Sequence, residues 1–264
     1  MGNDKEAKNI SLTADVPCIC QSRDGMAEET VISVVREHFI EISVNGRFIA
    51  RLSCTPDDLD KLVLGRLYTE RLINRIEDVN RIFICKKGEI AEVTLESQIE
   101  LVNSTDTDPT CCTGNRQFLV RKDRRNLEVL KEVQASQDEV FELTEYFQQD
   151  TTIHKHTGGT HSCFIRYPDG IIEGYEDISR HNALDKAVGA MLFKRHDSSE
   201  CMLFTSGRIA ADMAEKCIAA GIPILISKAS PTESALQLAR EHNLNIIGQA
   251  WPDAYFDFSV SYTG

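Results

Sequence analysis

The second half of the chain alternates short apolar runs with amphipathic helical patterns, and this order restricts the fold more than any other feature. Strands that alternate with helices predict parallel pairing, with helices on both faces of one sheet. The sequence therefore predicts a three-layer α/β/α domain. The expected strands are residues 162–168, 171–177, 201–206, 224–228 and 245–250, and the expected helices are 182–195, 209–220 and 231–242.

The first half mixes strands with a single long helix. Apolar alternation flanks Asn45-Gly46, a dipeptide that favours a tight hairpin turn, so two strands are expected within residues 30–56. A helix is predicted over 59–73 and short strands over 81–88 and 90–97, and a helix over 137–149 opens the second half. The predicted organisation is a flexible tail over 1–27, a mixed β-rich domain over 28–136 with an exposed loop at about 103–126, and the α/β domain over 137–264.

Charge and hydropathy exclude several classes of partner. The 264 residues include 29 Lys and Arg against 41 Asp and Glu, a formal net charge of −12. A surface this acidic repels a phosphate backbone, so nucleic-acid binding is not expected. No apolar run approaches the ~20 residues of a membrane helix, and the amino-terminal segment lacks the apolar stretch of a secretion signal. We therefore expect a cytoplasmic protein with no membrane partner.

Nine cysteines stand at irregular spacings. An odd number without a secretion signal does not indicate a disulfide framework. Cys18 and Cys20 match no motif and have no assigned role. Four others lie in apolar patterns and are expected to be buried small hydrophobes: Cys54, Cys85, Cys201 and Cys217.

A polar segment over residues 97–126 carries two adjacent thiols, Cys111 and Cys112. Long loops of this kind are commonly functional. The basic residues that follow the pair would favour the thiolate, which is the nucleophilic form of cysteine. The segment is a candidate for covalent sulfur chemistry, and a pair of exposed cysteines without a role is the alternative.

The segment HKHTGGTHSC, residues 154–163, allows three interpretations. Gly158-Gly159, between Thr157 and Thr160-His161, suits a tight turn whose backbone amides approach an anion. A purely structural turn is the second interpretation. The third is a zinc site, because imidazole and thiolate are zinc donors, although the spacing matches no zinc motif. Its candidate ligands are His154, His156, His161 and Cys163.

Two strand-to-helix junctions are rich in polar side chains. In open α/β sheets the ligand lies beyond the carboxyl ends of the strands. Guanidinium groups can bind phosphate in bidentate fashion, imidazole can donate hydrogen bonds or move protons, and a helix amino terminus favours phosphate. Together with a third junction over 227–232, these two junctions predict a site for an anionic small molecule or nucleotide. The candidate binding residues are Arg180, His181, Asn182, Ser206, Gly207 and Arg208.

Four segments of the second half resemble, in order and spacing, the formate dehydrogenase accessory sulfurtransferase (FdhD) family. A stretch of the first half, ARLSCTPDDLDKLVLGRLYTERLI, resembles the first helix of that family and its flanking strand. The resemblance covers about residues 28–262. The four segments are TGGTHSCFI, EDISRHNALDKAVG, FTSGRIAADMAEKCIAAGIPILIS and SPTESALQLAREHNLNIIG.

The resemblance implies a cytidine-deaminase-like α/β domain beside a smaller β-containing domain, in a homodimer. It implies a sulfurtransferase that acts as a persulfide carrier: sulfur from a cysteine desulfurase passes to the molybdenum bis(guanine dinucleotide) cofactor before the cofactor enters the formate dehydrogenase apoenzyme. A guanine nucleotide would mimic that cofactor. Deamination and bound zinc are not expected, because the deaminase zinc signature is absent from the sequence.

Two segments depart from the family pattern. The family loop reads Cys-Gly-x-Cys-Gly, whereas this chain places Gly114 where the second cysteine would stand, and which of Cys111 and Cys112 bears the persulfide stays open. The carboxyl-terminal stretch lacks the arginine of the family. The expected cofactor contacts there are Gln249, Ala250 and Trp251.

Two functional hypotheses therefore stand from the sequence. In the first, the loop cysteines carry sulfur to the cofactor. In the second, the chain is a non-catalytic binding protein or chaperone for that cofactor, and the missing spaced cysteine marks a loss of thiol chemistry. A metal-dependent hydrolase is a third and weaker interpretation.

Overall fold

A six-stranded sheet forms the centre of the second half of the computed structural model, which describes residues 11–98, 100–103, 116–121, 127–149 and 151–259. The pairs β12–β13 and β13–β14 are parallel, and the remaining pairs are antiparallel. The expected parallel pairing therefore holds for the three central strands, because the outer strands return through short hairpins that require antiparallel neighbours. The order is β11 (Ile172–Asp177), β10 (His161–Arg166), β12 (Met202–Thr205), β13 (Ile224–Ser227), β14 (Asn245–Trp251) and β15 (Ala254–Asp257).

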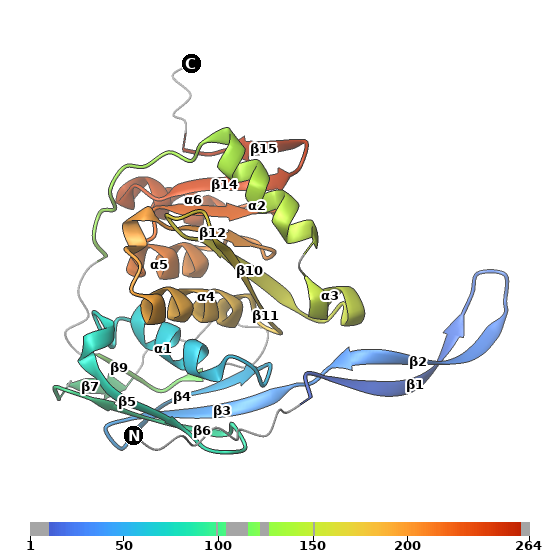
Figure 1. Ribbon diagram of the computed structural model, residues 1–264, viewed down its shortest axis with the longest axis horizontal. Coiled ribbons are helices and arrows are strands. Elements are labelled where there is room, and N and C mark those ends of the chain that lie inside the picture. Colours follow the sequence, from blue (N-terminus) through green and yellow to red (C-terminus); the bar gives the residue numbers. More distant parts are fainter. Residues whose placement is uncertain (1–10, 99, 104–115, 122–126, 150, 260–264) are drawn as a thin grey trace.

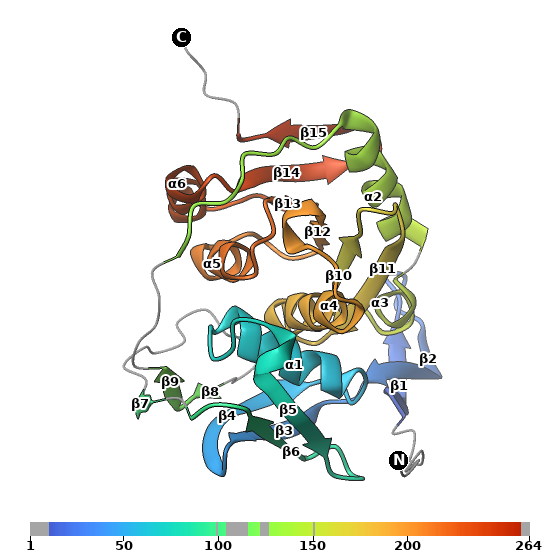
Figure 2. The same ribbon diagram turned by 60° about the vertical axis from the view of Figure 1, so that its left-hand side comes forward.

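Helices cover both faces of this sheet, as predicted (Figures 1 and 2). One face packs against α4 (Arg180–Lys194), α5 (Ala211–Ala219) and α6 (Glu233–His242) through an extended buried apolar cluster. The opposite face packs against α2 (Gln137–Gln149) through a second cluster that includes Phe164 and Phe204. The three-layer α/β/α prediction is thus confirmed, while its likeness to cytidine deaminases stays a prediction.

A five-stranded sheet dominates the first half, in the order β5-β6-β3-β4-β8. The predicted hairpin at Asn45-Gly46 joins β3 to β4, and both turn residues have positive φ, at 48° and 77°. The strands are β3 (His38–Val44), β4 (Arg47–Cys54), β5 (Val79–Ile84), β6 (Ile90–Leu95) and β8 (Arg116–Gln117), beside a small pair formed by β7 (Leu101–Asn103) and β9 (Leu119–Arg121).

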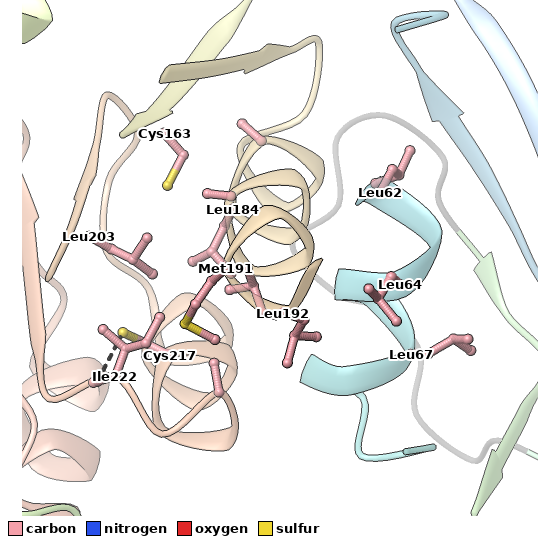
Figure 3. Close-up of a cluster of buried hydrophobic side chains, with 14 of the residues drawn as sticks. Leu62, Leu64, Leu67, Cys163, Leu184, Met191, Leu192, Leu203, Cys217 and Ile222 are labelled. Atoms are coloured by element: carbon pink, nitrogen blue, oxygen red, sulfur yellow. Dashed lines mark hydrogen bonds between the residues drawn. The ribbon is translucent and has the colours of Figure 1, made fainter. Parts of the chain in front are cut away.

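The helix pair α1 and α4 lies between the two sheets and joins the two halves (Figure 2). Helix α1 (Leu59–Thr69) packs closely on α4 because each helix has a glycine at the contact. A Cβ atom on Gly65 would lie 1.8 Å from the carbonyl oxygen of Asp185, and one on Gly189 would lie 2.0 Å from that of Lys61. The leucines of α1 and the apolar face of α4 then belong to one continuous core (Figure 3).

The amino-terminal part of the structure differs from the predicted flexible tail. Residues 13–27 lie within an antiparallel hairpin of β1 (Thr13–Gln21) and β2 (Ala27–Val35), which projects from the body of the molecule (Figure 1). The prediction was wrong here because these strands bury no side chain, so they lack the one-sided burial that produces a recognisable apolar alternation.

Three short helices complete the described chain: η1 (Ile76–Asp78), α3 (Thr152–Thr157) and η2 (Ser198–Glu200). The sequence predicted a turn around Gly158, and α3 precedes that turn. Within the described residues, no helix combines the length and apolar character needed to cross a membrane.

Candidate functional site

The carboxyl ends of the central strands lie at one edge of the six-stranded sheet, together with the start of β10 and the end of β11. This follows from the register, since Cys163 of β10 is opposite Thr205 at the end of β12, and His161 is opposite Asp177 at the end of β11. The loops after β12 and β13 are joined by an isolated bridge between Ile209 and Pro231. The predicted convergence of the strand ends is therefore confirmed.

Five polar side chains at this edge form what we call the strand-end cluster. Four of them, His161, Arg180, His181 and Lys228, carry or can acquire positive charge, and the electrostatic effects of the other three are felt at His161. The fifth, Ser206, links the cluster to β10: its Oγ accepts the Ser162 N–H at 2.9 Å. Positive charge thus accumulates where the sheet presents its loops.

Burial and neighbouring positive charges both favour the neutral form of the His161 imidazole. Burial lowers the pKa of this imidazole below its ordinary value, and the neighbouring charges of Arg180, His154, Lys228 and His181 lower it further. Its Nδ1 lies 3.3 Å from Ser206 Oγ. Burial is the largest cause of this shift, and the smaller contribution of the neighbouring cations is the part that a bound anion would offset.

Helix α4 begins at the cluster with Arg180 and His181, and α5 supplies the acidic partner Asp212. The His181 Nε2 lies 2.9 Å from Asp212 Oδ2, and a terminal guanidinium nitrogen of Arg180 lies 3.8 Å from the same oxygen. Burial alone would raise the pKa of Asp212, but the His181 hydrogen bond and both cationic neighbours lower it overall. Asp212 was not predicted as a site residue, because its role depends on the packing of α5 beside α4.

Arg180 is held at the edge of the cluster with part of its guanidinium unmatched. Its Nε is buried and has no hydrogen-bond partner in the described part of the chain. A Cβ on Gly207 would lie 2.9 Å from Arg180 Cδ, so only glycine admits the arginine stem beside this loop. Gly207 therefore contributes space, and an unmatched buried donor is a feature that a ligand oxygen can satisfy.

Asn182 lies behind the cluster and not within it. Its side chain is fully buried and donates to the Ser53 carbonyl at 2.8 Å and to Asp177 Oδ1 at 2.9 Å. Asp177 also pairs with Lys186 at 2.9 Å, and the Lys186 ammonium contacts Thr55 Oγ1 at 2.6 Å. This network connects β4, β11 and α4, and it fixes the start of α4 from which Arg180 and His181 project.

The glycine turn after α3 is fixed mainly by its own side chains and by Glu176. The Thr157 hydroxyl donates to the Ile153 carbonyl at 2.8 Å, and the Thr160 hydroxyl donates to Glu176 at 2.9 Å. Gly158 ends α3 with φ 66° and has open space at its Cβ position, whereas a Cβ on Gly159 would meet Val35 of β2 at 2.7 Å. Of this turn, His161 alone joins the cluster.

The remaining predicted contacts divide by burial. Gln249 lies beside the loop that carries Lys228, and its Nε2 donates to Ser230 Oγ at 2.8 Å. Ala250 is buried in the apolar cluster that packs against α2, and the side chain of Trp251 is half-exposed. Arg208 is exposed. Lys228 was missed as a site residue, although its junction was noted, because a lone lysine after a strand carries no specific signal.

The proposed zinc ligands do not converge. His154 Nδ1 lies 2.7 Å from the Thr160 carbonyl, His156 Nδ1 lies 2.6 Å from the Thr152 carbonyl, and Cys163 is fully buried in the core. In the residues described, no group of three or more His, Cys, Asp and Glu side chains could hold a metal ion. This arrangement gives no support to the hydrolase interpretation.

The thiols fall into two groups. Cys54, Cys201 and Cys217 are buried, as predicted, and so is Cys163. Burial raises the pKa of each of these four thiols, to about 12 for Cys201. Cys85 departs from the prediction: it is half-buried in the β5–β6 turn, and backbone hydrogen bonds there outweigh burial and lower its pKa. Cys111 and Cys112 lie outside the described residues.

Two cavities lie away from the cluster. One, of about 480 Å³, is lined by α1, β5 and Phe193, and the other, of about 440 Å³, is lined by Tyr68, Arg71 and the segment 127–131 among others. Neither is lined by a residue predicted from the sequence as a site residue.

Fold and site together define a mixed α/β protein with a cationic cluster at the carboxyl ends of its parallel strands. The chain matches the model of the FdhD/NarQ family over residues 35–260. It belongs to this family.

Two relatives and one solved structure illustrate the relationship. The chain is 32% identical over 234 residues to the sulfur carrier protein FdhD of Bacillus pumilus, across 87% of this chain and 89% of that protein. It is 34% identical over 198 residues to that of Sulfurisphaera tokodaii, across 74% and 75%. A crystal structure from Desulfotalea psychrophila, described as a candidate formate dehydrogenase accessory protein, superposes with a TM-score of 0.78 at 22% identity, over 96% of this chain and 99% of that one. That last likeness shows a common fold.

Proposed function

We propose that this chain is a cytoplasmic sulfur carrier required for formate dehydrogenase activity, with the molybdenum bis(guanine dinucleotide) cofactor as its substrate. The observation that carries the proposal is the strand-end cluster, where His161, Arg180, His181 and Lys228 surround a sheet edge in a chain of net charge −12. The relatives that match 87% and 74% of the chain are named sulfur carrier proteins.

The cluster suits the pyrophosphate groups of a guanine dinucleotide. Arg180 offers a guanidinium whose Nε is buried and unmatched in the described structure, and guanidinium binds phosphate oxygens in bidentate fashion. Lys228 adds a point charge at the same sheet edge, where its ammonium lies 5.1 Å from the centroid of the Phe147 ring. Asp212 stays ionised through its hydrogen bond with His181 and keeps that side chain oriented.

Sulfur transfer itself would use Cys111 or Cys112. The thiolate attacks the terminal sulfur of a persulfide on a cysteine desulfurase, a new S–S bond forms, and the desulfurase thiolate leaves with the electron pair of the broken S–S bond. In delivery, the terminal sulfur becomes sulfide by accepting two electrons from the molybdenum centre, and the carrier thiolate is regenerated. The loaded cofactor then passes to the formate dehydrogenase apoenzyme.

Persulfide mapping tests the thiol part of this proposal. The full chain is incubated with a cysteine desulfurase and cysteine, alkylated, digested and mapped by mass spectrometry. We expect one added sulfur atom on the peptide holding Cys111 and Cys112, and its loss in Cys111→Ala/Cys112→Ala. A label only elsewhere would remove the loop from the mechanism.

The departure from the family loop favours one alternative, a binding protein for the cofactor without thiol chemistry. Gly114 stands where the family has its second cysteine. Under this alternative, the double alanine variant still supports maturation of formate dehydrogenase in cells lacking the native protein. Loss of maturation with nucleotide binding intact supports the carrier.

A further inference from the structure

The hairpin of β1 and β2, which we call the arm, carries the two cysteines to which the sequence assigns no role. Residues 13–21 pair in unbroken antiparallel register with residues 27–35, and the arm projects from the body of the molecule (Figure 1). Cys18 and Cys20 lie in the half of β1 that leads to the turn at residues 22–26. Both thiols are therefore held outside the core, on an ordered strand.

Alternation along β1 places the two thiols on one face of the arm. Side chains two positions apart in a strand point to the same side, and two positions span roughly 6.8 Å. Cys20 is exposed and Cys18 is partly exposed. The residues opposite them in β2 are Glu28 and Thr30, so neither cysteine has another cysteine across the hairpin. The face thus presents two thiols from a single strand.

Access distinguishes these thiols from the others that the structure describes. Cys85 is half-buried in a turn of the body, and four further cysteines are buried in the core. Sulfur passes between two proteins only when the accepting thiol reaches the donor's cysteine. The arm is two strands wide, with ~4.8 Å between the strands. It can therefore enter a cleft of a donor protein from which the body of the molecule is excluded.

The spacing of the pair prevents the two thiols from oxidising each other. A disulfide needs Cβ atoms about 3.8 Å apart, whereas parallel side chains on one strand keep them roughly 6.8 Å apart. A persulfide is lost when a neighbouring thiolate attacks its inner sulfur, because a disulfide then forms and hydrosulfide leaves. Between Cys18 and Cys20 this reaction would require the strand pairing to break. A sulfur atom bound to either cysteine is therefore retained.

We propose that Cys18 and Cys20 form a second sulfur-accepting site, distinct from Cys111 and Cys112, which takes the outer sulfur of a persulfide on the donor enzyme. The thiolate of either cysteine attacks that outer sulfur, and a new S–S bond forms. The donor's thiolate leaves with the electron pair of the broken bond, and the outer sulfur keeps its proton. This inference rests on the proposed function, from which it takes the persulfide donor.

Peptide mapping tests the site, because trypsin places the arm cysteines, the loop cysteines and Cys85 on three different peptides. These peptides are residues 9–23, 88–116 and 82–86. The full chain is incubated with a cysteine desulfurase and cysteine, alkylated, digested and mapped by mass spectrometry. We expect one added sulfur atom on the 9–23 peptide, at a level about tenfold or more above that of the 82–86 peptide, because the arm is accessible to the donor.

Serine variants test whether both thiols belong to the site. Cys18→Ser and Cys20→Ser should each keep the label on the 9–23 peptide, and the double variant should lose it while the 88–116 peptide keeps its own. Loss of the whole label in one single variant would overturn the paired site. Circular dichroism verifies that each variant is folded.

Val129→Cys, made in the double serine variant, is the matched control for exposure. Val129 is 63% exposed but lies on the body of the molecule, and its tryptic peptide, residues 126–131, contains no other cysteine. Its label should be at most about one tenth of that of the arm, because a thiol on the body does not reach into the donor. Equal labelling would reduce the result to exposure and overturn the proposal.

The same map separates this inference from the proposed function. A label on the 88–116 peptide without one on the 9–23 peptide would overturn the arm site and leave the proposed function intact. A label on the 9–23 peptide alone would support the arm site and contradict the role proposed for Cys111 and Cys112.

Discussion

Two groups of charged side chains lie on either side of the start of α4, and they differ in how their charges are balanced. Behind the helix start, Lys186 contacts the carboxylates of Asp177 and Asp57, and all three belong to one hydrogen-bonded network. At the strand-end cluster, the described carboxylate in contact with Arg180 and His181 is that of Asp212. The balanced group holds the chain together, and the group with excess positive charge is the one suited to a ligand.

The largest expected effect comes from breaking the balanced group. Lys186→Met leaves Asp177 buried without its cation, and we expect a loss of about 3–5 kcal/mol in the free energy of unfolding. Urea denaturation measures it. The double variant Asp177→Asn/Lys186→Met should lose less than the sum of the single variants, because neither charge is then left alone. Additive losses would show that the two residues act independently.

A substitution in the strand-end cluster should lower the affinity for the ligand and leave the free energy of unfolding nearly unchanged. Arg180→Gln is expected to weaken binding of diguanosine pyrophosphate by about 10- to 100-fold, the value of a charge-assisted phosphate contact. Isothermal titration calorimetry measures the affinity, and urea denaturation should give nearly the same free energy of unfolding. Unaltered affinity would place the nucleotide elsewhere.

Lys228→Met should have a smaller effect on the same affinity, about twofold to fivefold, because this half-exposed ammonium is screened by solvent. Lys86→Met, in the exposed turn between β5 and β6, is the control and should bind like the unmodified chain. Equal losses of affinity in the two lysine variants would show that only the net charge of the protein matters, and not the position of Lys228.

The smallest effect concerns pH. Burial and the neighbouring cations lower the pKa of His161 below its ordinary 6.5, so it is neutral at pH 7 and gains its proton only in more acidic solution. Affinity for diguanosine pyrophosphate, whose internal phosphates do not titrate in this range, should therefore rise as the pH falls from 7 to 5.

The free energy of unfolding should fall over the same pH range, because the unfolded chain binds the His161 proton more readily. His161→Gln should remove the contribution of His161 to the pH dependence of both the affinity and the free energy of unfolding. An unchanged pH dependence of binding in this variant would separate His161 from the ligand.

Sequence reasoning succeeded where local chemistry decides the structure. Asn45-Gly46 determines a turn by its own backbone preference, and the apolar runs of the second half become strands because both of their faces are buried. The junctions that hold Arg180, His181 and Ser206 were found because strand ends in an α/β sheet share an edge.

It failed where long-range packing decides. Asn182 follows two cluster residues in the chain, yet its side chain turns inward to Ser53 of β4. The two residues are 129 positions apart in the sequence, so no local pattern reveals this contact. The hairpin of β1 and β2 was missed because its strands have no buried face. The contact of Gly65 with α4 was equally invisible, because a glycine within a helix indicates no partner.

The buried thiols have a consequence for a protein that handles reactive sulfur. A persulfide can pass its outer sulfur to whichever thiolate reaches it first, and a carrier with many cysteines risks loading the wrong one. Cys54, Cys163, Cys201 and Cys217 are shut inside the molecule and kept protonated by their surroundings. Burial in the core thus prevents these four thiols from accepting sulfur at the surface. Which cysteine of the chain is loaded therefore depends on packing as much as on the nucleophilicity of the thiol.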